Sequence, residues 1–302
     1  MRPRPKFRSM PFLVLAMLTT ASEGFAQLQP FPVRENSQII QFQQYNQRSQ
    51  SFSHRRGVPD WSNGTEFPHD VFTFVRVQYG SSGSWRTDYP DSDLNFTYRL
   101  QQLTSIKVDP SPITLRITDP RLFDHPFLYF CEPGGRGGGS RWGGGLDLSP
   151  EEARILRRYF DNGGFALFDD FWGEGEWDTF YRDIKKVFPD REYQDLPLEH
   201  PIFHTVFDLK ERPQIPAIDY GVAGRGRGPN GTNVSWERSD ATQVHYRAFF
   251  DDKGRMVCCI CHNTDLGDGW EEEGVDEWYF HEYSEKKSYP MGVNIVFYAL
   301  TH

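Results

Sequence analysis

Cysteine is scarce in this sequence: the 302 residues include four, Cys131, Cys258, Cys259 and Cys261. Cys258 and Cys259 are neighbours in the chain and would not normally bond to each other. Secreted scaffolds that depend on disulfides are much denser in cysteine than this. A disulfide framework is therefore excluded as the basis of the fold, and the redox state of the four thiols stays open.

The chain also has little positive charge. Lysine and arginine number 33 against 42 aspartate and glutamate residues, which gives a net charge of −9. Phosphate backbones attract cationic surfaces, so an acidic chain is a poor partner for nucleic acid. We expect no nucleic-acid partner, and we attribute the charge to solubility.

Long apolar runs are missing. One short apolar run near the N-terminus is preceded by basic residues and followed by small ones. Four basic residues lie within residues 2–8, an apolar stretch covers residues 11–21, and the small residues Gly24 and Ala26 precede Gln27. This pattern is typical of a secretory signal peptide, and its apolar part is too short to span a membrane. We expect residues 1–26 to be removed and the chain to be periplasmic or secreted, without a transmembrane span; an uncleaved anchor is the alternative.

The remaining chain divides into a tail and one domain. Residues 27–69 are rich in Gln, Asn, Ser and Arg and show no period, which indicates a polar tail that is disordered or loosely docked. Regular patterns begin near residue 71, so residues 70–302 are interpreted as a single domain.

Strand and helix patterns alternate through the first half of this domain. Ser149, Pro150 and Glu152 form a capping box before one helix. Alternation of this kind predicts an α/β fold with a mainly parallel sheet and helices on both faces. We expect strands at 71–79, 113–118, 127–131 and 164–170, helices at 94–103 (capped by Asp93), 150–162 and 177–187, and a hairpin turning at 252–254. For the apolar segment 292–300 we favour a helix packed on the sheet over a strand.

Two carboxylates follow the fourth of these strands. Asp169 and Asp170 end an apolar run, and Trp172 comes directly after them. Ligands of open α/β sheets bind at the carboxyl ends of the strands. Neighbouring acids there can hold a divalent cation, or one can act as a general base with a raised pKa. The alternative is that one acid caps the next helix and the other is solvated.

Three segments that follow strands combine aromatic and acidic residues, and they would converge at one edge of a parallel sheet. Tryptophan faces beside carboxylates suit sugar binding, because the ring covers the apolar face of a sugar and the acids accept its hydroxyls. The alternative is aromatic packing of long loops onto the fold. The candidate ligand-binding residues are Trp85, Asp88, Tyr89, Trp172, Asp265, Asp268 and Trp270.

His204 is the histidine that we assign to this edge, as a proton carrier beside Asp169 and Asp170. His200 and His204 have the spacing of a zinc-binding helix, but Pro201 lies between them and the glutamate of that motif is missing. No cofactor is identified from the sequence. A divalent metal fits the acids, and its identity is open.

The cysteines are interpreted as structural. On a strand, Cys259 and Cys261 face one side while Cys258 and His262 face the other, which separates them as metal ligands. Cys131 ends a strand but lacks the glycines of a nucleophile elbow. The glycine-rich stretch at 134–145 lacks the ending of a phosphate-binding loop, and we expect a lid or an insertion there.

Several longer segments carry a resemblance, among them FVRVQYG, WRTDYPDSDLNFTYRLQQLTSI, EEARILRRYFDNGGFALFDDFWG, HNTDLGDGW and MGVNIVFYALTH. With these segments the chain resembles a bacterial family, the domain of unknown function 4159 (DUF4159). The resemblance covers about residues 70–302 and implies a flavodoxin-like fold of the class I glutamine-amidotransferase-like superfamily, in bacterial envelope contexts. The fourth strand leads into Asp169 and Asp170 in place of a cysteine elbow, so glutamine hydrolysis is not expected.

These patterns leave two functions open. The first is a non-catalytic periplasmic binding or envelope-assembly module that recognises a glycan or an envelope protein through a strand-end groove. The second is a metal-assisted or acid/base hydrolase of a glycan or related substrate, with Asp169 or Asp170 as ligand or base and His204 as proton carrier. Whether the chain is an enzyme is not decided by the sequence.

Overall fold

The computed structural model describes residues 57–67, 70–80, 84–135 and 144–302. The expected signal peptide, most of the polar tail and the central part of the glycine-rich stretch lie outside these residues. Within the described ranges, no helix is both long enough and apolar enough to cross a bilayer. Residues 57–67 contact the domain, because the Trp61 indole donates a hydrogen bond of 2.9 Å to the Val108 carbonyl.

The apolar runs of the sequence form one seven-stranded sheet in the order β2-β1-β3-β4-β7-β6-β5. The five strands from β2 to β7 are parallel, and β6 and β5 continue the sheet antiparallel. Numbered along the chain, the parallel strands have the order of a doubly wound sheet of the flavodoxin-like kind. The strands are β1 (Val75–Gln78), β2 (Ile113–Arg116), β3 (Phe127–Cys131), β4 (Phe165–Asp169), β5 (Gln194–Asp195), β6 (His245–Phe250) and β7 (Met256–His262).

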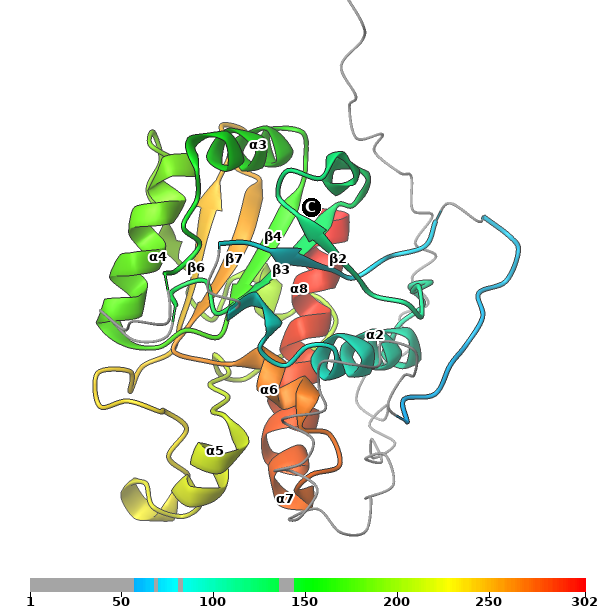
Figure 1. Ribbon diagram of the computed structural model, residues 1–302. Helices are drawn as coiled ribbons and strands as arrows, with labels where there is room; N and C mark the ends of the chain where they lie inside the picture. Colours follow the sequence, from blue (N-terminus) through cyan, green and yellow to red (C-terminus); the bar gives the residue numbers. More distant parts are fainter. Residues whose placement is uncertain (1–56, 68–69, 81–83, 136–143) are drawn as a thin grey trace, which may run out of the picture.

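Helices cover both faces of this sheet, as the alternating pattern predicts (Figure 1). On one face pack α2 (Asp91–Leu103), α6 (Leu266–Glu271), α7 (Glu277–Tyr279), the π-helix η5 (Phe280–Ser288) and α8 (Tyr289–Thr301). On the other face pack α3 (Pro150–Asp161) and α4 (Gly173–Val187). The helix α5 (Ile218–Gly224) and the 3₁₀ turns η1 (Ser84–Arg86), η2 (Pro120–Asp124), η3 (Pro201–Phe203) and η4 (Pro229–Gly231) lie in the connections.

Side chains of each strand alternate between the two cores. On β3, Tyr129 and Cys131 face the α8 layer, whereas Leu128 and Phe130 face the α3 layer. The same period of two places Cys259 and Cys261 on the α8 side and Cys258 on the α3 side. All four cysteines are buried, free thiols.

Local patterns predicted several elements correctly. Ser149 and Glu152 form the capping box of α3, and β6 and β7 form the expected hairpin. The apolar C-terminal segment is a helix, α8, which packs on the sheet. The α/β class and the mainly parallel sheet are confirmed.

The predicted starts of two helices were wrong. Asp93 does not cap α2, because this helix begins at Asp91, after Pro90. The side chain of Asp93 is buried and pairs with Arg76. Helix α4 begins at Gly173, four residues before the predicted start. Two carboxylates accept hydrogen bonds from backbone N–H groups at this start. Glu176, in the first turn of α4, accepts from Trp172, and Asp240, which is distant in the chain, accepts from Glu174.

Gly164 offers a test of the packing between α3 and β4. A Cβ atom at this position would lie 2.3 Å from the ring of Tyr159. That ring is held by hydrogen bonds from its hydroxyl to the carbonyls of His125 and Phe165. We expect Gly164→Ala to lower the free energy of unfolding by about 1–3 kcal/mol in urea denaturation, because overpacking forces the ring or the backbone to shift.

Gly64→Ala is the matched control, because nothing lies within 4 Å of a Cβ at that position. Its unfolding free energy should differ from the wild type by less than about 0.5 kcal/mol. Equal effects of the two substitutions would contradict this account of the packing.

Candidate functional site

Acidic residues from four connections meet at the carboxyl edge of the parallel strands. Asp88 follows β1, Glu132 follows β3, Asp170 follows β4, and Asp268 lies in α6 after β7. Strands β1 and β3 are adjacent in the sheet, and the connections from them leave in opposite directions across the strand order. Open α/β sheets bind their ligands at such a switch point.

The backbone at these strand ends is unusual. Glu132, Asp170 and Asn263 are the first residues after β3, β4 and β7, and they have φ values of 50°, 59° and 63°. Asp88 also lies in this left-handed region, with φ of 62°. Residues other than glycine are uncommon there, although Asp and Asn are enriched. Such conformations concentrate at functional sites, where the surrounding structure maintains them.

Two groups of three side chains at this edge each approach closely enough to hold a cation. The Cys131 Sγ atom lies 3.9 Å from carboxylate oxygens of both Asp88 and Asp170. One ligand atom from each of these three residues lies within 4.8 Å of the others, and the same holds for Asp88, Asp268 and Glu271. Asp88 belongs to both groups. We call these residues, Asp88, Cys131, Asp170, Asp268 and Glu271, the acidic cluster.

Burial dominates the electrostatics of the acidic cluster. The exposed fractions of Asp88, Asp170 and Asp268 are 7%, 8% and 8%. Burial raises the pKa of each of these carboxyls well above its ordinary value, and the neighbouring acids raise it further. Burial, with the Asp88 carboxylate next, also raises the pKa of the Cys131 thiol. Without a cation, the cluster therefore retains protons.

Asp169 and Asp170 are adjacent in sequence but have different roles. Asp169 is fully buried and accepts hydrogen bonds from the backbone N–H groups of Leu266 (3.2 Å) and Gly267 (3.0 Å). The hydroxyl of Tyr129 donates to it as well, at 3.2 Å. Burial raises its pKa to about 7. Asp169 thus joins β4 to the start of α6, whereas Asp170 belongs to the acidic cluster.

Arg76 supports this edge and was not identified from the sequence. Its guanidinium is fully buried and donates to both oxygens of Asp93. The same group donates to the carbonyls of Trp85 (3.0 Å) and Thr87 (2.7 Å). It therefore fixes the segment that holds Asp88. Phe72, Phe74 and Arg76 alternate along the β1 segment, and both phenylalanines pack in the core on the side of α8. This alternation was the signal in the sequence that Arg76 would be buried.

The tryptophans do not line a groove. Trp85, Trp172 and Trp270 are all buried. Trp270 stacks on Phe96, with ring centroids 4.2 Å apart, so that face of its ring is covered. Tyr89 is half-buried beside Trp85. The aromatic side chains complete the core, and the sugar-stacking arrangement that we expected is absent from this part of the structure.

Asp265 and His204 have other hydrogen-bonding roles, although Asp265 lies close to the acids of the cluster. The Asp265 side chain accepts a hydrogen bond from the Asp268 N–H and caps α6. His204 follows η3, and its ring nitrogens contact Asp208 (2.6 Å) and the Leu198 carbonyl (2.7 Å). These contacts occupy both nitrogens outside the acidic cluster.

A different histidine lies near the strand ends. His262 is the last residue of β7, and its Nε2 atom donates to the Gly173 carbonyl at 3.0 Å while Arg247 donates to Nδ1. Burial lowers its pKa to about 3, so the ring is neutral. His262 links β7 to the start of α4.

These features define an α/β protein with a mainly parallel sheet and an acidic site at the carboxyl ends of its strands. A family model described as Domain of unknown function (DUF4159) matches residues 73–300, and the chain belongs to this family. A comparison with curated proteins found no match.

The Arg76–Asp93 pair provides the first test at this site. Asp93→Asn leaves the buried guanidinium without its counter-charge, so we expect the free energy of unfolding to fall by about 3–5 kcal/mol. Asp161→Asn is the control, because Asp161 pairs with Arg157 on the exposed face of α3. Urea denaturation measures both, and similar losses in the two variants would show that the buried pair has no special role.

Asp169 and the neighbouring acidic cluster also predict how stability depends on pH. Unfolded aspartate has a pKa of about 3.9, whereas burial raises the folded-state pKa values here, to about 7 for Asp169. The folded chain therefore binds more protons than the unfolded chain between these values. Stability should fall as pH rises from about 4 to about 7.

Urea denaturation in a chelator, at several pH values across this range, measures the effect. An Asp88→Asn/Asp170→Asn double variant should show a weaker pH dependence. A wild-type chain that becomes more stable as pH rises would contradict the prediction.

Proposed function

We propose that the chain is an exported binding module that holds a divalent cation in the acidic cluster and recognises an envelope glycan or protein at that edge. The observation behind this proposal is the convergence of Asp88, Cys131 and Asp170, whose ligand atoms lie within 4.8 Å of one another. Cys131 is the last residue of β3, and Asp88 and Asp170 lie in the connections after its two neighbours in the sheet, β1 and β4. Export is proposed from the signal-peptide pattern of residues 1–26.

The donor atoms fit a cation. Asp88, Asp268 and Glu271 offer oxygen only, the ligand type that Mg²⁺, Ca²⁺ and Mn²⁺ prefer. Cys131 adds sulfur to the group formed with Asp88 and Asp170, which favours Zn²⁺ or Fe²⁺ there. A cation would compensate the mutual repulsion of these carboxylates and release the protons that burial retains.

Binding is favoured over acid/base catalysis by the placement of the other candidates. Asp169 is engaged with the backbone of α6, and the ring nitrogens of His204 contact Asp208 and Leu198. No acid and histidine among the sequence-predicted residues form a pair within the acidic cluster in the described residues. The small exposed fractions of the acids suit an ion better than a polymer.

A metal-assisted hydrolase is the second candidate, favoured by the position of Asp170. This residue occupies a left-handed turn between β4 and α4, with a raised pKa and two further ligand atoms nearby. A bound cation would activate water there. Asp170 would then orient that water or accept its proton.

The strand order also supports, as a proposal, the flavodoxin-like fold of the bacterial class I glutamine-amidotransferase-like superfamily. This proposal about the fold does not extend to glutamine hydrolysis. Cys131 has a raised pKa and acidic neighbours, which disfavour the thiolate that a nucleophile requires.

Metal titration tests the proposal. A cation that binds the folded chain alone raises its stability, by about 2.7 kcal/mol at a hundred times the dissociation constant. We expect Mn²⁺, Ca²⁺ or Zn²⁺ to raise the melting temperature of the chelator-treated chain. Asp88→Asn should abolish the shift, because Asp88 belongs to both ligand groups.

Asp178→Asn, on the exposed face of α4, is the control and should keep the wild-type shift. The binding proposal fails if no divalent cation changes the melting temperature. Metal-dependent release of products from cell-wall glycan, lost in Asp170→Asn, would instead establish the hydrolase.

A further inference from the structure

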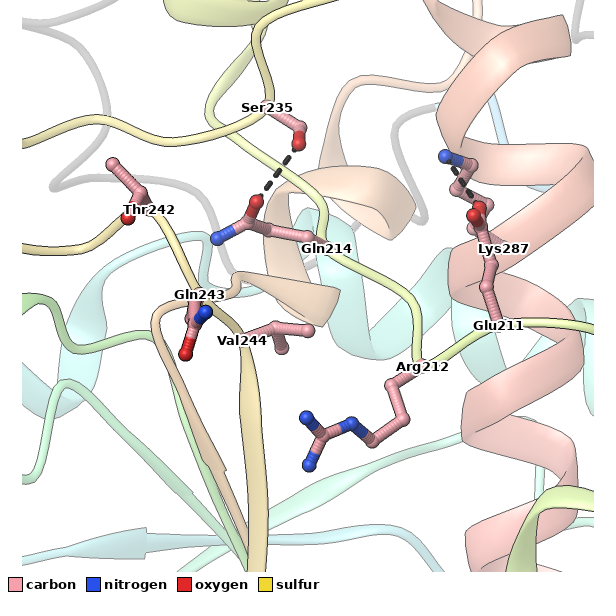
Figure 2. A pocket seen from close by; sticks show the side chains of 8 residues that line it. All are labelled: Glu211, Arg212, Gln214, Ser235, Thr242, Gln243, Val244 and Lys287. Atoms are coloured by element: carbon pink, nitrogen blue, oxygen red, sulfur yellow. Dashed lines mark hydrogen bonds and ion pairs between the residues drawn. The ribbon is translucent and has the colours of Figure 1, made fainter. Parts of the chain in front are cut away.

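A polar pocket lies beside the start of β6, and none of its lining residues belongs to the acidic cluster. Its volume is about 350 Å³, within the range of small-molecule sites. Two cations, Arg212 and Lys287, and one acid, Glu211, contribute charge to its wall (Figure 2). Uncharged hydrogen-bonding groups come from Gln214, Ser235, Thr242 and Gln243. These residues come from three separate parts of the chain, so the pocket is a product of the fold.

One wall of this pocket is rigidly built. Gln214 is 9% exposed, and its amide nitrogen donates to the carbonyls of Ala241 (3.1 Å) and Asn263 (3.0 Å). Its amide oxygen accepts a hydrogen bond from the Ser235 hydroxyl at 2.8 Å (Figure 2). A buried amide whose nitrogen and oxygen are both hydrogen-bonded is held in one orientation. This side chain therefore loses little conformational entropy when a ligand binds.

The cations of the pocket are less exposed than the acids that pair with them. Lys287 is 21% exposed, whereas its partner Glu211 is 65% exposed. Arg212 is 32% exposed, and its partner Asp195 is 39% exposed. Ion pairs with exposed members contribute little to stability, so a bound anion can replace these carboxylates at small cost.

Positive charge is also in excess beside the pocket. Asp195 accepts from Arg212 at 2.7 Å, contacts His245 at 2.6 Å and lies 3.7 Å from Arg247. Two guanidinium groups and an imidazole thus share a single carboxylate. This occurs in a chain whose net charge is −9.

We propose that this pocket binds a small ligand that combines one anionic group with several hydroxyls, such as a sugar acid or a sugar phosphate. Arg212 and Lys287 would hold the anionic group. Ser235, Thr242 and Gln243 would bond the hydroxyls, because amides and hydroxyls both donate and accept. Gln214 would hold Ser235 in place, since the Ser235 hydroxyl donates to its amide oxygen. The proposal is independent of the cation in the acidic cluster.

The lining excludes other ligand classes. Val244 is the one apolar side chain among the lining residues, so an apolar molecule would leave the polar groups without partners. A neutral sugar would gain nothing from the charges of Arg212 and Lys287, which would stay paired with Asp195 and Glu211. The volume suits a molecule of monosaccharide size better than a polymer.

Ligand-detected NMR and thermal unfolding of the full chain test this proposal in a chelator. The probes are D-glucuronate, D-glucose 6-phosphate and D-glucose. We expect one or both anionic sugars to bind, and glucose to bind at least about tenfold more weakly; the two anionic probes distinguish carboxylate from phosphate. Arg212→Gln and Lys287→Gln should each weaken anionic-sugar binding at least about tenfold.

Two control variants locate the effect. Lys210→Gln removes a nearby cation that is 81% exposed and pairs with Asp208, so it should leave sugar binding unchanged. Asp88→Asn should also leave it unchanged, which separates this pocket from the acidic cluster. The proposal is overturned if neither anionic sugar binds, if glucose binds equally well, or if Lys210→Gln weakens binding as much as Arg212→Gln.

Discussion

The buried ion pair between Arg76 and Asp93 is the interaction on which the carboxyl edge depends. A buried guanidinium must be compensated, and Asp93 does so from the first turns of α2. The remaining donors of Arg76 bind the backbone carbonyls of Trp85 and Thr87, next to Asp88. One cation therefore connects β1, the following loop and α2. It also places positive charge beside the acids, where it lowers the pKa of Asp88 against the effect of burial.

Alternation along β4 explains how two adjacent acids differ so much. Asp169 is the last residue of the strand and points into the layer of α6, where backbone N–H groups satisfy it. Asp170 follows in a left-handed turn, and its side chain joins those of Asp88 and Cys131. The chain thus uses one carboxylate to position the α6 segment and the next for the acidic cluster. This separation supports a single cation-binding role at the edge better than a pair of catalytic acids.

Much of the fold could be predicted from local pattern, whereas the partners of individual side chains could not. The capping box of α3, the β6–β7 hairpin and the C-terminal helix depend on neighbours in sequence, and the pattern identified them. The convergence of Asp88, Asp170 and Asp268 followed from the rule that parallel strands end at one edge. Arg76 and Asp93 are 17 residues apart, and their pairing depends on the fold as a whole. Trp270 was wrongly predicted to face a ligand. Its stacking partner Phe96 belongs to α2, far away in the sequence, so this contact could not be predicted from local pattern.

The left-handed residues at the strand ends restrict how this edge can change over evolution. At Asp170 and Asn263, a β-branched side chain would strain the turn, whereas aspartate, asparagine and glycine fit it. The permitted exchanges at these positions therefore alter charge while the backbone path is retained. A relative could gain or lose a metal ligand here by a single exchange between acid and amide. The backbone conformation of the turns would be retained while the charge of the side chains changes. One scaffold could therefore carry either an acidic or an uncharged strand edge.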